Sequence, residues 1–480
     1  MPRVFVVSNR VTDLSSARQA GGVAVAIADM IANQSVVWFG WGGAISDDGD
    51  IASERYAETA CGPSKTIKAT LSQEEHDQFY LGYANSVVWP VFHNRLDLAQ
   101  FEAGHFASYK RVNRRFAEKL AALLQPDDVV WVHDYHFLTL AKELRALGVR
   151  NAIGFFLHIP VPPAQAFLAI PEHVELAHAL ACYDLVGLQT KLDVSNLIDF
   201  FLQSVFGHLM RDGSVRVGNQ SVRLASFPVG IDLAAFKDVS SDLEKSAIET
   251  RIVGVDRLDY TKGLPQKFRA YGKFLLDHPE FKGRVVLAQI APPTRESLEA
   301  YCDIRIELEN LAGSINGLHS DLSWTPVQYL HRTFEREQLF SIYRSSKVAL
   351  VTPLRDGMNL VAKEYVASQN PDDPGVLVLS RFAGAAESLS DAIIVNPYSI
   401  PETADAIKVA LEMPLEERQQ RHRSLLTTIA KEDSAQWSAN FLSQLTAAHR
   451  QRLDVNDKPL GQLITSADWF KRQATIERGA

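Results

Sequence analysis

The feature of the sequence that most constrains the fold is the alternation of short apolar runs with segments of helical periodicity. A strand with one solvated face alternates apolar and polar residues, whereas these runs are almost wholly apolar. Such runs are typical of parallel strands that helices cover on both faces of a sheet. The expected strands are residues 4–7, 36–40, 129–132, 153–159, 251–255, 285–290, 348–351, 375–380 and 392–395. Helical patterns, with apolar residues recurring at spacings of three and four, include residues 114–124 and 270–278.

The length of the chain indicates two such units. It has 480 residues, 46% of them hydrophobic, whereas a single hydrophobic core rarely grows beyond about 250–300 residues. The apolar segment 226–236 and the polar residues after it look like a crossing between two sheets. We therefore expect an N-terminal domain over residues 1–229, a C-terminal domain over 230–435, and a helix in 436–480 that crosses back to the first domain, followed by a tail. The expected fold class is α/β, with two doubly wound, Rossmann-like domains facing across a deep cleft.

Composition argues against several classes of protein. The net charge of −8 does not suit a nucleic-acid surface. Cys61, Cys182 and Cys302 are far apart in sequence and form neither a thiolate cluster nor a disulfide framework, as expected in a reducing cytoplasm. No apolar run approaches the roughly 20 residues of a membrane span, and the start of the chain is too soon polar for a signal peptide. We therefore expect a soluble cytoplasmic protein with neither a membrane nor a nucleic acid as partner.

Polar clusters follow the predicted strands at their carboxyl ends, which is the edge of a doubly wound sheet where ligands bind. One cluster alone is more often a structural turn, but the shared placement strongly favours a binding site. The clusters are "SNR" at 8–10, "HDYH" at 133–136, "HIP" at 158–160, "DRLDYTKG" at 256–263, "APPTRE" at 291–296 and "TPLRDGMN" at 352–359.

The cluster at 256–263 is suited to an anion. Arg257 and Lys262 share a loop that Gly263 closes, so both can reach one anionic group. A diphosphate leaving group needs such cations because negative charge develops on it as its bond breaks. Arg offers a bidentate fork and Lys a mobile point charge. The alternative is a solvated ion pair between Arg257 and Asp259.

The cluster at 352–359 leads into a helix that begins with "LVAKEY". The first backbone amides, those of Leu360 and Val361, can bind a phosphate without any side chain. Glu364 lies one turn further on, where a carboxylate can accept both hydroxyls of a ribose, and Asp356 can accept sugar hydroxyls. The alternative for Glu364 is a surface residue that the helix dipole favours near an N-terminus.

Further candidates come from other strand ends and loops. Arginines suit a phosphate, aromatic faces suit the apolar face of a pyranose ring, and carboxylates suit its hydroxyls. Each aromatic, taken alone, is more often part of a core. These candidates are Arg10, Trp41, Tyr80, Trp89, Asp134 and Arg295. The pair Gly21–Gly22 can open a helix toward a phosphate, although a lone Gly pair is weak evidence.

Several motifs are absent from the sequence. It contains no GxGxxG, GxxxxGK[ST], GxSxG or HExxH pattern. The acidic residues 47–50 have the composition of a solvated loop, and no second His at metal-ligand spacing accompanies His158. A hydrogen bond to a sugar or a satisfied core role is the better interpretation of His158. We therefore expect neither a metal nor a cofactor.

The motifs as a set resemble the trehalose-6-phosphate synthases over roughly residues 3–448. They are "SNR", "AGG", "WFGWGG", "HDYH", "FFLHIP", "DLVGLQT", "FPVGID", "DRLDYTKGLP", "QIAPPTR", "YRSSKVALVTPLRDGMNLVAKEYVASQ" and "RFAGAAESL", in this order. The resemblance implies the GT-B fold and transfer of glucose from UDP-glucose, as co-substrate, to glucose-6-phosphate. It further implies retention at the anomeric carbon, no metal, and a role in trehalose biosynthesis and osmoprotection.

The resemblance also implies roles for individual residues. The donor residues would be Gly21, Gly22, Arg257, Lys262, Phe334, Leu360, Val361, Ala362, Lys363 and Glu364. The acceptor residues would be Arg10, Trp41, Tyr80, Asp134 and Arg295. His158 and Asp356 would contact the donor glucose and act in catalysis with Arg257 and Lys262, and Trp89 and Ile159 would shape the choice of anomer. A homo-oligomer is expected, and the chain has no room for the phosphatase domain of some relatives, so a separate phosphatase would act on the product.

Two other functions compete with this expectation. A sister transferase, such as a glucosylglycerol-phosphate synthase, would keep the donor residues and change the acceptor pocket. Weighing against it is the presence of Arg10, Tyr80, Trp41 and Arg295. A catalytically silent sugar-nucleotide sensor would be expected to lose Arg257, Lys262 or Glu364, and all three are present.

Overall fold

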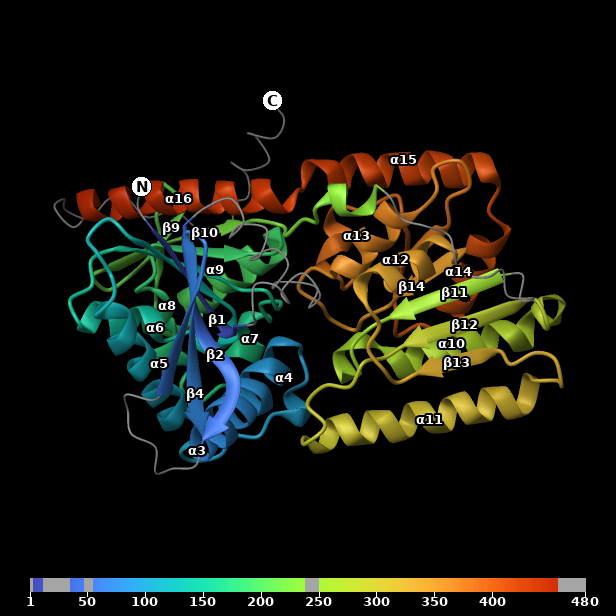
Figure 1. Ribbon diagram of the computed structural model, residues 1–480, viewed down its shortest axis with the longest axis horizontal. Coiled ribbons are helices and arrows are strands. Elements are labelled where there is room, and N and C mark those ends of the chain that lie inside the picture. Colours follow the sequence, from blue (N-terminus) through green and yellow to red (C-terminus); the bar gives the residue numbers. More distant parts are fainter. Residues whose placement is uncertain (1–2, 12–34, 47–54, 238–249, 456–480) are drawn as a thin grey trace. The chain divides into compact units, whose positions relative to one another are not determined.

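The computed structural model describes residues 3–11, 35–46, 55–237 and 250–455 (Figure 1). It divides the chain into two compact units, and each is described by itself. Met1–Phe227 and Trp437–Ala480 form the first unit, and Pro228–Gln436 form the second. These divisions lie beside the boundaries expected from the sequence, at 229/230 and 435/436.

The first unit contains a 10-stranded sheet in the order β3-β4-β2-β1-β5-β6-β7-β10-β9-β8. Its strands are β1 (Val4–Arg10), β2 (Val36–Ser46), β3 (Tyr56–Cys61), β4 (Ser64–Ser72), β5 (Val129–His133), β6 (Ala152–Phe156), β7 (Leu185–Leu188), β8 (His208–Leu209), β9 (Ser214–Val217) and β10 (Gln220–Ser226). Its helical segments are α3 (Gln73–Glu75), η2 (His76–Val88), α4 (Trp89–Phe92), η3 (Leu96–Leu98), α5 (His105–Ala121), η4 (Tyr135–Phe137), α6 (Leu140–Ala146), α7 (Ala164–Phe167), α8 (His173–Leu180) and α9 (Lys191–Val205). Helix α16 (Ser434–Val455) begins in the second unit and joins the first at Trp437.

This sheet differs from the wholly parallel one that we expect from the sequence. The strands from β4 through β2, β1, β5, β6 and β7 to β10 pair in parallel, but β3 pairs antiparallel with β4, and β8 and β9 continue antiparallel from β10. The antiparallel pairings lie at the two ends of the sheet, where β3 and β8 are the edge strands and β9 lies between β10 and β8. Strand β1 also runs further than expected, so Ser8, Asn9 and Arg10 belong to the strand and do not follow it. Strand β6 is shorter than expected and ends at Phe156.

Helix α16 packs on this sheet (Figure 1), and two glycines of the sheet, Gly154 and Gly187, lie at the contact. A Cβ at Gly154 or Gly187 would lie 2.8 or 2.7 Å from the ring of Phe441, so only glycine allows this approach. The Phe441 ring stacks on Trp131 of β5, with 4.6 Å between centroids. The last described segment of the chain is thereby built into the core of the first unit.

The second unit contains a six-stranded sheet in the order β13-β12-β11-β14-β15-β16, and each described strand pairs in parallel with its neighbours. Its strands are β11 (Thr250–Val255), β12 (Val285–Ile290), β13 (Val327–Leu330), β14 (Val348–Val351), β15 (Val376–Ser380) and β16 (Ile393–Val395). Its helical segments are η5 (Leu233–Phe236), η6 (Tyr260–Lys262), α10 (Leu264–Asp277), η7 (Pro279–Phe281), α11 (Glu299–His319), α12 (Arg336–Arg344), α13 (Leu360–Ser368), η8 (Gly384–Glu387), α14 (Ile400–Glu412) and α15 (Leu415–Lys431). The order reverses between β11 and β14, which is the point where doubly wound sheets bind ligands.

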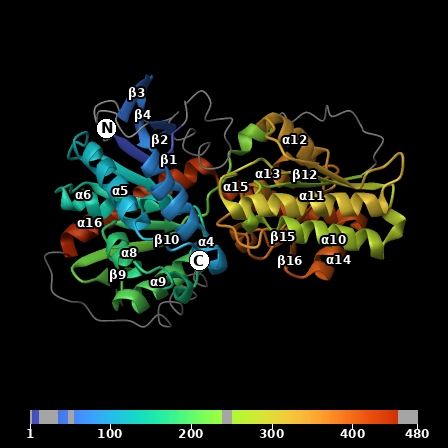
Figure 2. The ribbon, with the colours of Figure 1, turned by 90° about the horizontal axis from the view of Figure 1, so that it is seen from below.

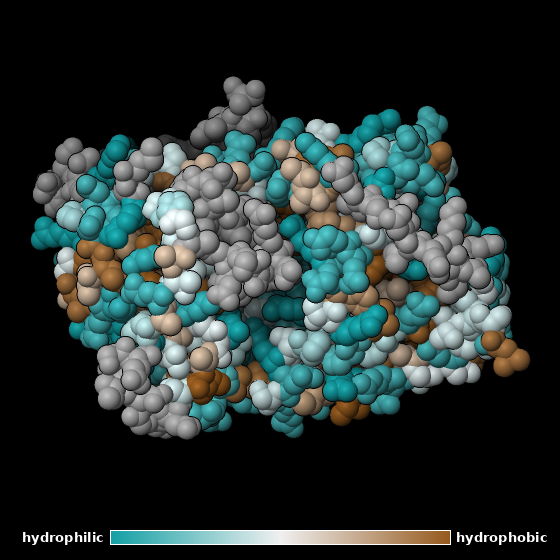
Figure 3. Space-filling model, viewed as in Figure 1, coloured by the Kyte–Doolittle hydropathy of each residue, from teal (hydrophilic) through white to brown (hydrophobic). Residues whose placement is uncertain are grey.

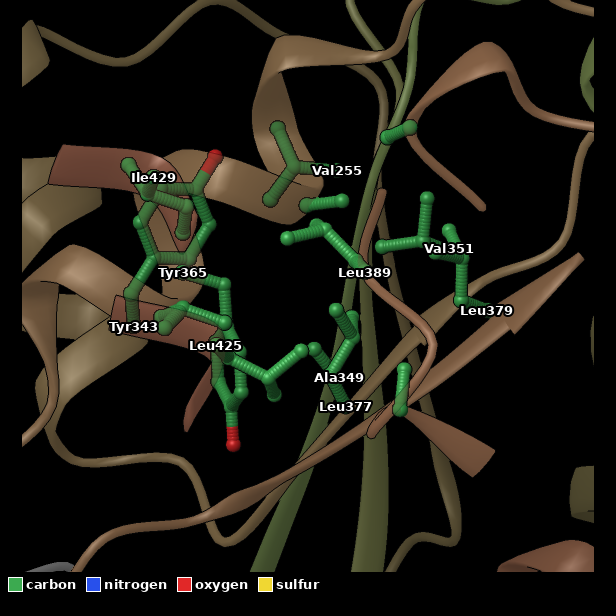
Figure 4. Packing of buried hydrophobic residues seen from close by; sticks show 14 of the residues in the cluster. Val255, Tyr343, Ala349, Val351, Tyr365, Leu377, Leu379, Leu389, Leu425 and Ile429 are labelled. Carbon is green, nitrogen blue, oxygen red and sulfur yellow. The ribbon is translucent and has the colours of Figure 1, made fainter. Parts of the chain in front are cut away.

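Helices cover both faces of this second sheet. Helix α10 packs with α11 and α14, whereas α13 packs with α12 and α15 on the other face (Figure 2). Figure 4 shows the core beneath α13, where Tyr365 and Leu425 lie close to Leu377 of β15. Burial of each large apolar side chain contributes about 1.5–3 kcal/mol, so this core holds the start of α13 in a fixed place.

The hydrophobic residues that remain exposed are scattered. In the view of Figure 3, outside the grey segments, they form small groups among hydrophilic residues. Among the residues that the structure describes, no helix combines the length and apolarity needed to cross a membrane.

Candidate active site

The turn between β14 and α13 has a cap that the sequence analysis did not include. Asn359 adopts a left-handed backbone conformation, with φ of 75°. Its side-chain oxygen accepts a hydrogen bond from the amide of Ala362 at 3.1 Å. The amide of Ala362, which the resemblance places in the donor site, is thus already bonded, whereas this cap leaves those of Leu360 and Val361 for a ligand.

A neighbouring loop packs tightly against this turn. The amide of Ala385 donates to the carbonyl of Met358 at 2.8 Å. A Cβ at Gly384 would lie only 1.8 Å from the carbonyl oxygen of Gly357, so only glycine fits there. The segment "RFAGAAESL" therefore serves as a support that fixes the path of the turn.

Lys262 and Asp356 form an ion pair at this turn. Their charged atoms are 2.6 Å apart, and the side chains are 12% and 15% exposed. Asn359 donates a second hydrogen bond to the same carboxylate oxygen at 3.0 Å. The sequence assigned Lys262 to a diphosphate and Asp356 to a sugar, and the structure brings the two together. When a phosphate approaches, Lys262 can exchange its anionic partner Asp356 for the phosphate. This exchange avoids the larger cost of leaving a buried charge unpaired.

Asp259 is a buried carboxylate, which contradicts the alternative of a solvated pair with Arg257. Its side chain is fully buried and lies 3.8 Å from the guanidinium of Arg295. Burial by itself would raise the pKa of Asp259, but the charges of Arg295, Arg257 and Lys262 bring this pKa below its ordinary value. Arg257 itself is exposed. The second unit therefore gathers three cations around two carboxylates, Asp259 and Asp356, and this surplus of positive charge favours an anionic ligand.

Glu364, one turn into α13, is not an ordinary surface glutamate. The residue is half-buried, and desolvation raises the pKa of its carboxyl group to about 7, although the charge of Arg336 opposes the shift. A carboxyl group with a pKa near 7 in a binding site is a functional candidate. Phe334, the expected neighbour of the nucleotide, is half-buried, and the guanidinium of Arg332 lies 4.5 Å from its ring centroid.

The structure contradicts a donor-binding role for the side chain of Lys363. This ammonium group is fully buried, lies 2.7 Å from Glu432 and donates to the carbonyl of Val229 at 2.8 Å. Both partners adjoin the segments that join the two units, and the ammonium is committed to them. The sequence showed a cation at the start of a helix but not the direction in which it points.

In the first unit, three acceptor candidates form one aromatic and cationic group. The guanidinium of Arg10 lies 4.7 Å from the ring centroid of Trp41, and the Trp41 and Tyr80 rings are 5.1 Å apart. A Cβ at Gly43 would be 2.5 Å from the Arg10 guanidinium, so a larger residue would displace the arginine. The Tyr80 ring stacks at 13° on His136, a contact that the sequence did not predict.

Asp134 and His158 form a second group in this unit. Asp134 has a positive φ of 73°, and its carboxylate accepts the amide of His158 at 3.3 Å. His158 has a histidine neighbour after all, because its Nε2 lies 3.0 Å from Nδ1 of His133. Desolvation lowers the pKa of His158 to about 3. The imidazole is therefore neutral at physiological pH and is suited to hydrogen bonding with a sugar hydroxyl.

The remaining candidates are buried or lie outside the described residues. Trp89 and Ile159, the expected determinants of anomer choice, are 4% and 6% exposed. Trp89 packs against His93 and Tyr135. Gly21 and Gly22 lie outside the described residues. In the described parts of the chain, no group of three or more His, Cys, Asp or Glu side chains is placed to hold a metal ion.

Three comparisons with known proteins agree with this picture. A model of glycosyltransferase family 20 matches residues 4–447. A trehalose-6-phosphate synthase of Sodalis glossinidius (strain morsitans) is 41% identical over 476 residues, which cover 97% of this chain and 100% of the relative.

Solved structures are similar over nearly the whole chain. An α,α-trehalose-phosphate synthase (UDP-forming) from Burkholderia xenovorans in complex with glucose-6-phosphate has a TM-score of 0.88 and 40% identity, covering 93% of this chain and 100% of that one. A protein from E. coli bound with UDP-2-fluoro glucose has a TM-score of 0.87 and 42% identity, covering 92% of this chain and 98% of that one.

Two α/β units with polar side chains at their strand ends, together with these solved relatives, define a glycosyltransferase of the two-domain GT-B class. The fold class expected from the sequence is confirmed. The chain belongs to glycosyltransferase family 20, and the resemblance to the trehalose-6-phosphate synthases is confirmed as well.

Proposed function

We propose that this chain transfers glucose from UDP-glucose to glucose-6-phosphate, giving α,α-trehalose-6-phosphate and UDP. The observation that carries the proposal is the cationic group beside α13, where Lys262 is paired with Asp356 and the charges of Arg257 and Arg295 act on the buried Asp259. Membership of family 20 supports the choice of these two substrates, because one relative is in complex with glucose-6-phosphate and another is bound with UDP-2-fluoro glucose.

The second unit binds the donor in this proposal. Arg257 and Lys262 hold the diphosphate and stabilise the charge that develops on it. The amides of Leu360 and Val361 contact a phosphate oxygen, and Glu364 accepts the hydroxyls of the ribose. The sugar of the donor lies against Asp356 and His158, Phe334 lies by the base, and Gly21 and Gly22 contribute amides.

The acceptor residues come from both units. Arg10 and Arg295 bind the phosphate of glucose-6-phosphate with charge-assisted hydrogen bonds. Trp41 and Tyr80 offer aromatic faces to the pyranose ring, and Asp134 accepts its hydroxyls. Trp89 and Ile159 select the anomer through the shape of the wall around the ring.

The chemistry proposed is a front-face displacement with retention. The bond between the anomeric carbon and the diphosphate oxygen breaks, and the acceptor oxygen bonds to the anomeric carbon on the same face. The proton of the acceptor hydroxyl passes to the departing phosphate oxygen, so the protein need only position the substrates and stabilise the leaving group. We assign no carboxylate as a nucleophile and no metal or cofactor to this site.

The proposal is tested by measuring nucleoside diphosphate release across a grid of sugar nucleotides and acceptors. UDP-glucose with glucose-6-phosphate should be turned over and should give trehalose-6-phosphate. Glycerol-3-phosphate should be a poor acceptor because it has no ring for Trp41 and Tyr80 and no ring hydroxyls for Asp134. If glycerol-3-phosphate were used better than glucose-6-phosphate, the chain would be a sister transferase. If no pair of substrates were turned over, the better interpretation would be a catalytically silent sugar-nucleotide sensor.

We also propose that the enzyme works in the cytoplasm as a homo-oligomer and that a separate phosphatase consumes its product. Light scattering of the purified protein measures whether it is a homo-oligomer. If a separate phosphatase consumes the product, the purified enzyme should release no phosphate from trehalose-6-phosphate on prolonged incubation.

A further inference from the structure

Arg295 is held by two buried side chains, Tyr301 and Asp259, and the argument from the sequence did not include Tyr301. It follows β12 and has a positive φ of 48°, a conformation that costs energy in a residue other than glycine. Its guanidinium Nη1 donates to the hydroxyl oxygen of Tyr301 at 2.6 Å. That hydroxyl in turn donates to Asp259 Oδ2 at 3.1 Å. Tyr301 is therefore the middle member of a directed chain of hydrogen bonds from Arg295 to a carboxylate.

The carboxylate at the end of this chain also orders the donor loop. Oδ1 of Asp259 accepts the amide of Thr261 at 2.9 Å and so caps the short turn that carries Lys262. A fully buried carboxylate cannot exchange these partners for water, so its geometry is strongly determined. One oxygen of Asp259 thus serves the turn of Lys262, and the other serves Tyr301 and Arg295.

We propose that Tyr301 is a positioning residue for the acceptor phosphate: its hydroxyl holds Arg295 in a binding orientation and ties it to the carboxylate that shapes the donor loop. This inference rests on the proposed function, in which Arg295 binds the phosphate of the acceptor. An arginine that is already oriented loses less conformational freedom when the phosphate arrives, so the acceptor binds more tightly.

A purely structural role is the alternative for Tyr301. The residue is 2% exposed, and its ring packs edge to face against Tyr260 with 5.2 Å between centroids. Tyr301→Phe keeps that ring and removes only the hydroxyl, so it separates packing from positioning. Tyr271 provides a matched control, because it is equally buried in the same unit and its hydroxyl donates to the carbonyl of Val285 at 2.9 Å.

The test compares Tyr301→Phe and Tyr271→Phe with the wild type in kcat, the KM of each substrate and Tm. Tyr301→Phe should raise the KM of glucose-6-phosphate roughly tenfold, the scale of losing a hydrogen bond to a charged group. The KM of UDP-glucose should change less than about twofold, and Tm should fall no further than in Tyr271→Phe. An unchanged acceptor KM, or equal changes in both KM values, would overturn the proposal.

Two further variants keep the proposal falsifiable. In an Arg295→Ala background, adding Tyr301→Phe should have no further effect on the acceptor KM, because the two side chains act as one unit; additive effects would contradict the chain of hydrogen bonds. If Tyr301→Phe does not fold, Asp259→Asn is the substitute. It should raise the KM of both substrates, because the Asp259 carboxylate contacts both the turn that carries Lys262 and the hydroxyl that holds Arg295.

Failure of the proposed function would be distinct from failure of this inference. A wild-type enzyme that does not use glucose-6-phosphate as an acceptor but uses another sugar phosphate would refute the proposed acceptor. The comparison of Tyr301→Phe with Tyr271→Phe would then be made with that acceptor, because the inference concerns only how Arg295 binds the acceptor's phosphate. A wild type that uses glucose-6-phosphate, together with an inert Tyr301→Phe, would refute the inference alone.

Discussion

The candidate residues of the first unit are organised by aromatic rings, whereas those of the second are organised by opposite charges. Arg10 rests on the ring of Trp41, and Tyr80 stacks on His136. In the second unit, Lys262 is instead paired with Asp356 at 2.6 Å.

The difference indicates which part of each substrate a unit can bind. Rings present apolar faces, which suit a pyranose, and a single arginine on a ring can serve one phosphate. Cations with built-in carboxylate partners remain desolvated without being unpaired, and they can transfer to a diphosphate when it arrives. We therefore expect that removal of Arg257 or Lys262 in the second unit affects turnover, whereas removal of Arg10 in the first unit, like removal of Arg295, affects acceptor affinity.

The largest effect is expected in the second unit. Arg257→Ala or Lys262→Ala should lower kcat by roughly 10²–10³, the scale of losing one preorganised donor to a developing charge. The affinity for UDP-glucose should also fall, because the same groups contact the diphosphate before reaction. Steady-state kinetics at saturating substrates measures both.

Lys273→Ala is the matched control for these variants. Lys273 lies on α10, is partly exposed and pairs with Asp277 on the same helix at 2.8 Å, so its removal should leave kcat unchanged. Near wild-type turnover in both Arg257→Ala and Lys262→Ala would end the assignment of the second unit to the leaving group.

A smaller and different effect is expected in the first unit. Arg10→Ala should raise the KM of glucose-6-phosphate roughly 10- to 100-fold, since a hydrogen bond to a charged group contributes about 1.5–3 kcal/mol. The KM of UDP-glucose should stay nearly constant because the proposed function assigns Arg10 to the acceptor and not to the donor. Arg150→Ala, at an exposed arginine of the same unit, is the control. If Arg10→Ala lowered kcat and left both KM values intact, the contrast between the units would be wrong.

The sequence predicted the second unit better than the first, for a physical reason. Strands β12, β14 and β15 of the six-stranded sheet are buried along their whole length, so their apolar runs are uninterrupted and visible, as in residues 348–351. The edge strand β13 is only partly buried, and the sequence did not predict it. Strands β3 and β4 alternate polar and apolar residues at an edge, and strands β8 and β9 are short, so none of them produces such a run. These strands, which lie at or next to the two edges of the first sheet, were missed for that reason. The short central strand β7 was also missed, although it is fully buried.

The site residues were also predicted only where the sequence carries a local signal. Strand-end motifs located Lys262, Asp356 and Asp134, because position along the chain indicates which edge a residue occupies. Sequence position does not indicate the direction of a side chain, and so Lys363 was assigned to a ligand although it is buried against Glu432. Tyr301 lies inside an ordinary helical pattern, and no local signal distinguishes it from a core tyrosine.

A pH profile tests whether Glu364 belongs to the donor site. Desolvation raises its pKa to about 7, so the carboxyl group is mostly protonated below that pH. In the proposed function the ionised form accepts both ribose hydroxyls, so kcat/KM for UDP-glucose should rise up to about tenfold per pH unit until pH reaches about 7. Glu364→Gln should remove this ionisation, and the profile for the acceptor should lack it.

Stability should respond to the same group with the opposite sign. Because the folded-state pKa of Glu364 lies above its ordinary value, the neutral form is favoured on folding. The stability that this provides is complete below about pH 4.5 and is lost as pH rises through about 7. Relative to Glu364→Gln, the unliganded wild type should therefore lose Tm over that interval. Parallel Tm curves for the two proteins would contradict the shift.

The smallest expected effect is that of chelation. The comparison of the two units assigns neutralisation of the diphosphate to Arg257 and Lys262, and two side-chain cations leave no charge for a divalent metal to balance. Activity with UDP-glucose and glucose-6-phosphate should therefore be unchanged, within about 20%, after prolonged dialysis against EDTA, and added Mg²⁺ or Mn²⁺ should not increase it. Lys262→Ala offers a sharper version of the test, because a metal that assists the leaving group should then matter more. Loss of wild-type activity in EDTA, restored by either ion, would mean that the cations of the second unit do not suffice and that their pairing with Asp356 and Asp259 serves another purpose.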